Sequence, residues 1–121
     1  MAAGSGFAFL GVALGAFGTH ALRERISAES LQIWQTGVQY QLVHSLALVL
    51  VGIVAGQIDS KWIRLSGWLF FYGILIFSCS LYILALSGIR WFGAITPLGG
   101  LCFLAAWAML AWAAARPKKS A

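Results

Sequence analysis

The sequence predicts an all-α integral membrane protein, built as one bundle of four transmembrane helices. The chain has 121 residues, of which 61% are hydrophobic and only 9% are charged. A soluble domain of this length could not bury so much apolar surface, because a small globule leaves much of its chain exposed. The apolar residues also fall into four long runs separated by short polar connectors. An open chain satisfies its backbone groups in lipid only as helices.

The four predicted spans cover about residues 4–22, 38–56, 65–86 and 97–115. Each run has 19 to 22 residues, which at about 1.5 Å per residue gives roughly 28–33 Å, enough to cross the hydrocarbon. The first run carries no positive residue before its apolar part, so we expect a retained first helix rather than a cleaved signal peptide. Residues 1–121 are expected to form a single domain, with no room for a soluble catalytic domain.

Two connectors contain signals for helix starts. Ser27 has the residue type and position of an N-cap for a helix that begins at the membrane surface and runs into the second span. Thr96 and Pro97 are expected to start the fourth helix as N-cap and first-turn proline, and the alternative is a longer helix kinked at Pro97. Five tryptophans near predicted span ends are expected to form an aromatic belt. They are Trp34, Trp62, Trp68, Trp91 and Trp112, whereas Trp107 is mid-span.

The distribution of charge predicts the orientation in the membrane. The net charge of +5 comes from eight Lys and Arg and three Asp and Glu. These charges lie between spans and at the C-terminus, where they orient the chain in the lipid bilayer or contact anionic headgroups. No nucleic-acid partner is therefore expected. Four spans put both termini on one side, together with Lys61, Arg64, Arg116, Lys118 and Lys119. The opposite side has Arg23, Arg25 and Arg90. This excess predicts that both termini lie in the cytoplasm.

Small residues form helix-packing faces. Gly11, Gly15 and Gly18 share one face of the first span, and Gly52 and Gly56 form a second pair on the next span. Lipid gives helices no hydrophobic reason to associate, so such faces favour close backbone approach. We expect tight packing within one bundle, and the alternative is a homo-oligomer or a larger membrane complex.

Eight polar residues are expected to gather in one half of the bilayer. The spans bring the ends of the first and third helices and the starts of the second and fourth to the same side. In that half lie His20, Tyr40, Gln41, His44, Ser45, Ser78, Tyr82 and Thr96. The favoured explanation is interhelical hydrogen bonding, worth about 0.6–2 kcal/mol per bond. The alternative is a small polar cavity that holds a proton, water or a head group, since intramembrane ionisable residues are candidates for function.

A third hypothesis is a haem or metal site through His20 and His44. It is disfavoured because the two expected depths differ and no further ligand lies nearby, so no metal or cofactor is expected. No catalytic constellation appears either, and the chain is not expected to be an enzyme. The acids Glu24, Glu29 and Asp59 all lie in connectors, and the two cysteines, Cys79 and Cys102, lack metal-site spacing and are interpreted as small buried hydrophobes.

Four segments resemble a known family. The stretches "GAFGTHAL", "VQYQLVHSLAL", "FSCSLYILALSG" and "ITPLGGLCFLAAW" are similar, in order and spacing, to the YgdD-like small inner-membrane proteins. This family is also called domain of unknown function 423 and has the vertebrate transmembrane protein 256 as a relative. Thr19 and Cys79 depart from its pattern, where Ala and Gly are usual. The resemblance implies a four-helix membrane protein and brings no established activity or cofactor.

These observations lead to an expected class of function. The favoured expectation is a structural or accessory subunit, or an assembly partner, in the inner membrane. The alternative is a small carrier or proton-responsive protein that uses His44 with Gln41 and Tyr82.

Overall fold

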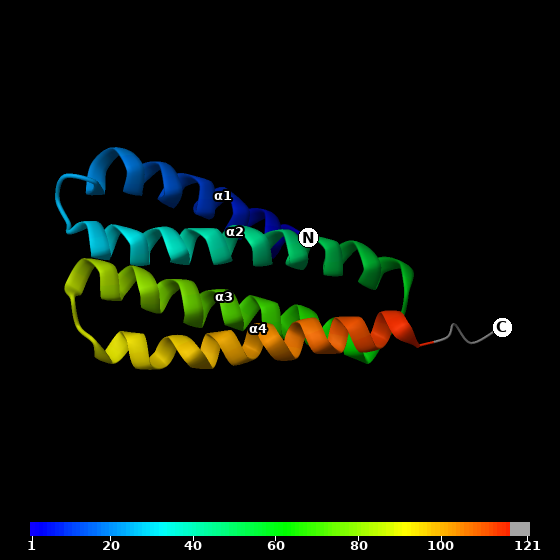
Figure 1. Cartoon of the computed structure of the whole chain (residues 1–121). Helices are drawn as coiled ribbons and strands as arrows, with labels where there is room; N and C mark the ends of the chain where they lie inside the picture. The colour runs from blue at the N-terminus through cyan, green and yellow to red at the C-terminus, as the bar shows by residue number, and fades with distance from the viewer. Residues whose placement is uncertain (117–121) are drawn as a thin grey trace.

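The computed structural model describes residues 1–116, and these residues form helices joined by short connectors (Figure 1). The elements are α1 (Ala2–Phe17), the π-helical turn η1 (Gly18–Leu22), α2 (Ala28–Gln57), α3 (Lys61–Ser87) and α4 (Trp91–Ala115). Four helical segments are long and apolar enough to cross a membrane, since α1 continues through η1. The predicted all-α fold with four spans is therefore confirmed.

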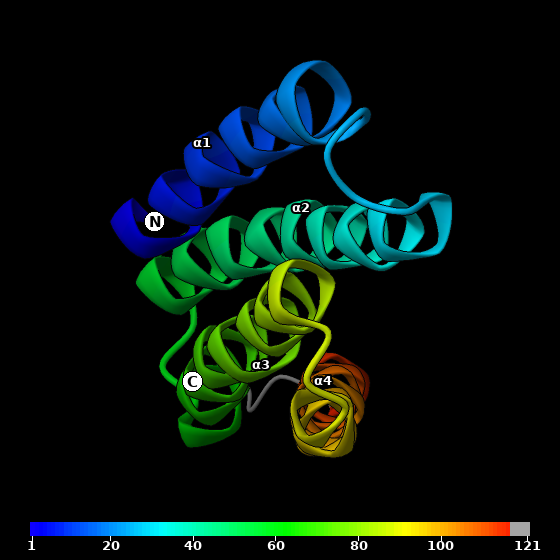
Figure 2. The same ribbon diagram turned by 90° about the vertical axis from the view of Figure 1, so that its left-hand side faces the viewer.

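Each helix packs on the next one in the chain, and neighbouring helices run in opposite directions (Figure 1). Seen end-on, α1 lies on one side of α2, while α3 and α4 lie on the other side (Figure 2). We call the end formed by residues 23–27 and 88–90 the connector end. The opposite end, formed by residues 58–60 and Arg116, is called the terminal end, and α1 begins on that side. Large apolar side chains on the outside of α1 and α4 are exposed, as expected for surfaces that face lipid.

The helices are longer than the predicted spans. The Ser27 side chain accepts a hydrogen bond from the Ser30 backbone N–H at 3.0 Å, which confirms the predicted N-cap. As a result, α2 has 30 residues and begins ten residues before the predicted span 38–56. Gly88 ends α3 in the left-handed region, with φ of 71°.

The predicted start of the fourth helix is wrong. Helix α4 begins at Trp91 and contains Pro97, so the alternative of a longer helix holds. Pro97 has no N–H to offer the carbonyl of Gly93. The hydroxyl of Thr96, predicted as the N-cap, instead donates to the carbonyl of Phe92 at 3.1 Å and thereby supports the turn before the proline.

The three glycines of the first predicted packing face, Gly11 and Gly15 in α1 and Gly18 in η1, face α2 within the same chain. A Cβ added at Gly11 would lie 2.8 Å from the Leu42 side chain, and one at Gly18 would lie 2.6 Å from the Trp34 ring. Gly15 is nearly as close to its neighbour, at 3.1 Å from Val38. These distances mean that the backbone of α1 can approach α2 only where side chains are absent.

The second predicted glycine pair does not act as a pair. A Cβ at Gly52 would lie 2.6 Å from the backbone nitrogen of Met1, so Gly52 makes room for the start of α1. Gly56 has no neighbouring atom within 4 Å of such a position, so it makes no packing contact in this chain. The reason is that α1 begins level with Gly52 and leaves the last turn of α2 uncovered.

The core divides into two parts along the bundle. Towards the terminal end, an apolar cluster includes Phe70, Ile74, Phe103 and Ala106. Towards the connector end, a smaller cluster contains Trp34 and Val38. Most of the bonds between helices that involve side chains lie around this second cluster and at the middle of the bundle.

Candidate functional site

Gln41 links three helices through one side chain. Its amide nitrogen donates to the carbonyl of Phe7 in α1 at 2.8 Å, and its amide oxygen accepts from the hydroxyl of Tyr82 in α3 at 2.6 Å. A carbonyl can only accept, so the nitrogen side of the amide must face Phe7. Only 4% of Gln41 is exposed. The polar group at the centre of the predicted cluster is therefore bonded on both of its sides.

Two buried serines bond to the backbone around Gln41. The hydroxyl of Ser78 in α3 donates to the carbonyl of Gly37 in α2 at 2.8 Å, and the hydroxyl of Ser45 donates to the carbonyl of Gln41 in its own helix. A Cβ at Gly37 would lie 2.8 Å from the ring of Tyr82, so the glycine leaves space for that ring. The contact between α2 and α3 thus combines close packing with a bond across the helices.

Trp34 lies in the core, although it was predicted to lie in the aromatic belt at the membrane surface. It is 3% exposed, its indole N–H donates to the carbonyl of Leu14 in α1 at 2.9 Å, and its ring centre lies 4.6 Å from that of Tyr82. The error follows from the start of α2, because a helix that begins at Ala28 puts Trp34 almost two turns inside it. The Ser27 cap was the signal in the sequence that could have placed this residue.

A separate bond joins α3 to α4. The hydroxyls of Ser80 and Thr96 lie 2.7 Å apart, and both residues are buried. Ser80 is not among the eight predicted residues, because two positions along a helix put it nearly opposite to Ser78. Helix α3 packs between α2 and α4, so serines on both of its faces find partners.

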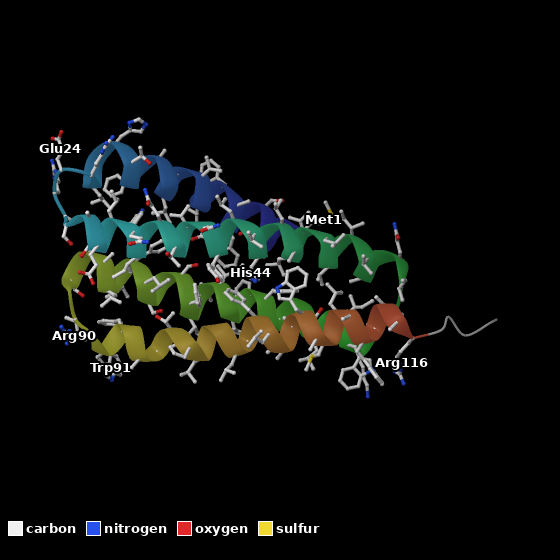
Figure 3. The ribbon with its side chains drawn as sticks, in the orientation of Figure 1. Met1, Glu24, His44, Arg90, Trp91 and Arg116 are labelled. Carbon is white, nitrogen blue, oxygen red and sulfur yellow. The ribbon has the colours of Figure 1, made fainter. Side chains whose placement is uncertain are left out.

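His44 bonds through both ring nitrogens. Its Nδ1 lies 2.8 Å from the carbonyl oxygen of Tyr40, and its Nε2 lies 3.1 Å from the indole Nε1 of Trp107 in α4. A carbonyl oxygen only accepts and an indole N–H only donates. The geometry therefore requires a neutral imidazole with its proton on Nδ1. The ring also stacks on Phe103, with ring centres 3.6 Å apart and planes 7° apart, and Figure 3 shows His44 midway along the bundle.

A cavity of about 570 Å³ lies beside His44. It is bounded by Tyr40 and His44 of α2, Phe77 of α3 and the part of α4 that includes Phe103 and Trp107. Tyr40 and Trp107 are 42% and 40% exposed, so they form the outer edge of the cavity. Five lining residues carry aromatic rings, and the other four are Pro97, Gly100, Leu101 and Leu104.

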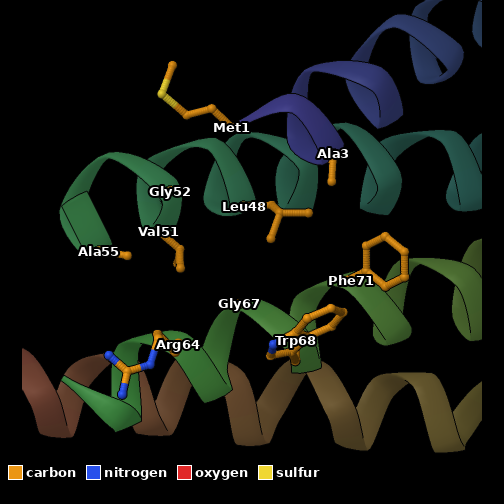
Figure 4. A pocket seen from close by; sticks show the side chains of 10 residues that line it. All are labelled: Met1, Ala3, Leu48, Val51, Gly52, Ala55, Arg64, Gly67, Trp68 and Phe71. Atoms are coloured by element: carbon orange, nitrogen blue, oxygen red, sulfur yellow. The ribbon is translucent and has the colours of Figure 1, made fainter. Parts of the chain in front are cut away.

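A second cavity, of about 260 Å³, lies near the terminal end (Figure 4). Leu48 and Val51 point into it from α2, and Trp68 and Phe71 line it from α3 (Figure 4). Its charged residue, Arg64, pairs with Asp59. It contains none of the eight predicted polar residues.

The structure brings together six of the eight predicted polar residues and leaves out two. Bonded within or between helices are Gln41, His44, Ser45, Ser78, Tyr82 and Thr96. Tyr40 contributes its backbone carbonyl, but its side chain lies at the surface. His20 is exposed on η1, which continues α1 on the side of α2 away from α4.

The positions of His20 and His44 do not support the hypothesis of a haem or metal site through these two residues. The two histidines lie on different sides of α2, and both nitrogens of His44 already have partners. Within residues 1–116, no group of three or more His, Cys, Asp or Glu side chains could hold a metal ion. This agrees with the different depths that the sequence predicts for the two histidines.

The fold and its interior define a small four-span membrane protein whose helices are joined by buried hydrogen bonds. The family model described as "Protein of unknown function (DUF423)" matches residues 14–100, and the chain belongs to this family, as its motifs predicted. A UPF0382 membrane protein from Staphylococcus saprophyticus is 48% identical over 105 residues, which are 85% of each chain. The UPF0382 membrane protein YwdK from Bacillus subtilis is 46% identical over 110 residues, or 90% of this chain and 89% of the relative. No solved structure matches significantly.

Proposed function

We propose that this chain is a structural or accessory membrane protein, a subunit or assembly partner of a larger membrane complex, rather than an enzyme or a carrier. The observation that carries the proposal is the double bonding of Gln41 to Phe7 and Tyr82. A polar group that binds or carries a substrate must be able to exchange partners. The side-chain amide of Gln41 instead holds three helices at a fixed register, because both of its sides are bonded.

The rest of the interior supports the same proposal. Trp34, Ser78 and His44 each bond to a different helix or to the backbone of their own helix. Among the described residues, one buried side-chain nitrogen or oxygen lacks a partner, the Nε1 of Trp62, and it belongs to the other end of the bundle. Buried polar groups with full hydrogen bonding specify one arrangement of the helices, which suits a part that must fit a larger assembly.

We place this protein in the inner (plasma) membrane with both termini in the cytoplasm. Among the described residues, each end of the bundle carries three Lys or Arg: Arg23, Arg25 and Arg90 at one end, and Lys61, Arg64 and Arg116 at the other. The excess that favours cytoplasmic termini comes from Lys118 and Lys119, which lie outside the described residues. Labelling single cysteines introduced at Glu24 and at Ser120 with a membrane-impermeant reagent tests the orientation, and we expect only the cysteine at position 24 to react from outside intact cells.

Purification from the native membrane in mild detergent, followed by native mass spectrometry, tests the accessory role. We expect the full chain to leave the membrane with a second membrane protein in a fixed ratio. The variant Gln41→Leu should lose this partner, because the register of α1, α2 and α3 is disturbed. The matched variant Gln39→Leu changes an exposed glutamine on the same helix and should retain it. A chain that is always alone, or only with copies of itself, contradicts the proposal.

A second candidate is a proton-responsive protein, favoured by the position of His44 at the cavity wall. Protonation of Nε2 would remove the acceptor of the Trp107 N–H, so the indole would have to turn away. Because Trp107 is half-exposed, such a movement could open the cavity on one side. Proteoliposomes with an imposed pH gradient and an internal pH dye test this candidate. Faster proton movement with the wild-type chain than with His44→Gln supports it, and equal rates exclude it.

A further inference from the structure

We propose that Lys61, Trp62, Trp112 and Arg116 form a binding site for one anionic phospholipid at the terminal end. The first two residues begin α3 and the last two end α4. Because α3 and α4 pack antiparallel, these two helix ends lie side by side (Figure 1). None of the four residues takes part in the hydrogen-bonded interior around Gln41 and His44.

The two basic side chains of this site are placed over tryptophan rings. The Nζ of Lys61 lies 5.1 Å from the ring centre of Trp62, and the guanidinium carbon of Arg116 lies 5.7 Å from the ring centre of Trp112. A cation over an indole face is attracted to the ring but keeps its N–H groups free to donate. Among residues 1–116, the carboxylate at this end is that of Asp59, and it pairs with Arg64. The other two cations are therefore available for a phosphate group.

An apolar pocket lies between the two tryptophans. It has a volume of about 300 Å³ and is lined by Trp62, Ala108, Met109 and Trp112. Its lining side chains are apolar apart from the indole N–H groups, so it can take the upper part of an acyl chain but offers little to a free inorganic anion. The combination of this pocket with two nearby cations matches an amphipathic ligand with a negative head, that is, an anionic phospholipid.

Trp62 also supplies an unsatisfied buried group. Its Nε1 is the one buried side-chain nitrogen or oxygen in the described part of the chain without a hydrogen-bond partner. Such a group costs free energy unless a partner is present. Because protein atoms cover this nitrogen, an ester or phosphate oxygen of a bound lipid becomes its acceptor only when the indole turns towards the pocket. The Ser60 side chain does not cap α3, so backbone N–H groups of its first turn and its positive dipole end also favour a phosphate there.

The opposite end of the bundle provides a matched control. Arg90 and Trp91 are also a basic residue beside a tryptophan at a helix start. However, Trp91 is 66% exposed, so its indole N–H can bond to water or lipid. The indole N–H of Trp62 is buried instead. If a membrane surface attracts any basic residue next to any tryptophan, both ends should bind anionic lipid equally.

Native mass spectrometry of the full chain, titrated with phosphatidylglycerol or phosphatidylcholine in mild detergent, tests the proposal. We expect one phosphatidylglycerol to remain bound when phosphatidylcholine has dissociated. The exposed double variant Lys61→Gln/Arg116→Gln should weaken phosphatidylglycerol binding by about 30-fold, from about 1 kcal/mol per basic residue. Trp62→Phe keeps the ring, removes the N–H and should weaken it by about 2- to 10-fold.

The control variant Arg90→Gln/Trp91→Phe should leave phosphatidylglycerol affinity unchanged. Equal affinity for the two lipids, or an equal loss in the control and in Lys61→Gln/Arg116→Gln, overturns the proposal. Soluble glycerol phosphate is added as a competitor, and displacement of the lipid by it at similar concentration would show a site for free phosphate and would also overturn it. The double variant changes only exposed side chains, so the test does not depend on whether Trp62→Phe folds.

Discussion

The hydroxyl of Tyr82 lies 2.6 Å from the side-chain oxygen of Gln41, across 41 positions of the sequence. The same amide reaches the backbone of α1 at Phe7 through its nitrogen. One residue therefore fixes the relative positions of three helices, at a point where lipid supplies no competing hydrogen bonds. If such buried polar groups hold the bundle together, substitutions that remove their hydrogen bonds should destabilise it.

Replacing Gln41 by Leu should destabilise the bundle. The substitution removes two interhelical bonds and leaves the partly buried hydroxyl of Tyr82 without its acceptor, so we expect a loss of about 1–3 kcal/mol in the free energy of unfolding. Unfolding by sodium dodecyl sulfate in mixed micelles, followed by circular dichroism, measures it. Gln39→Leu, two residues away and exposed, should change stability by less than about 0.5 kcal/mol. Equal effects of the two substitutions would mean that the hydrogen bonds of Gln41 do not matter.

A double-mutant cycle should isolate the bond between Gln41 and Tyr82. We expect Gln41→Leu and Tyr82→Phe together to cost less than the sum of the two single changes, with a coupling energy of about 0.6–1.7 kcal/mol. The same detergent unfolding assay supplies the four free energies. Strict additivity would show that the two side chains, although 2.6 Å apart in the structure, contribute independently.

Gly18→Ala should disturb the contact between η1 and α2. The new methyl group would lie 2.6 Å from the ring of Trp34, which its bond to Leu14 holds in place. We expect a loss of about 1–3 kcal/mol, as for other overpacked sites. Gly56→Ala is the control, because that position is open, and it should be neutral or stabilise the helix by up to about 1 kcal/mol. A harmless Gly18→Ala would contradict the close packing of η1 on α2.

The helices could be predicted because a chain that crosses lipid must bond its own backbone groups, which few structures besides a helix allow. Not all of the helix ends could be predicted. Apolar runs reveal the part of a helix that lies in the hydrocarbon. The first ten residues of α2, from Ala28 to Gly37, are partly polar and carry no such signal. Only the Ser27 cap indicates them. At Pro97 the sequence allowed either a helix start or a longer helix kinked at the proline, and α4 runs through the proline from Trp91.

The sequence predicted which types of residue form the candidate site better than it predicted towards which helix each side chain points. The period of 3.6 residues predicts that Tyr40, Gln41 and His44 share one face of α2. Gln41 and His44 are buried, whereas Tyr40 is 42% exposed. The period could not assign Ser80 or Trp107 to the site, since that required knowing which helices flank α3 and α4. His20 lies in the π-helical turn η1, where the 3.6-residue period no longer holds, and its side chain points outward.

The tautomer of His44 tests the central claim most directly, because its two partners allow only one position for the proton. The full chain, labelled with ¹⁵N-histidine and reconstituted in lipid nanodiscs at neutral pH, contains two histidines, and His20→Gln assigns their signals. We expect His44 to be neutral, with a protonated Nδ1 and an unprotonated Nε2 whose shift changes in Trp107→Phe. A proton on Nε2, in either the neutral or the charged ring, would contradict the hydrogen bond from Trp107. It would also contradict the claim that the polar groups of this interior serve to hold the helices together.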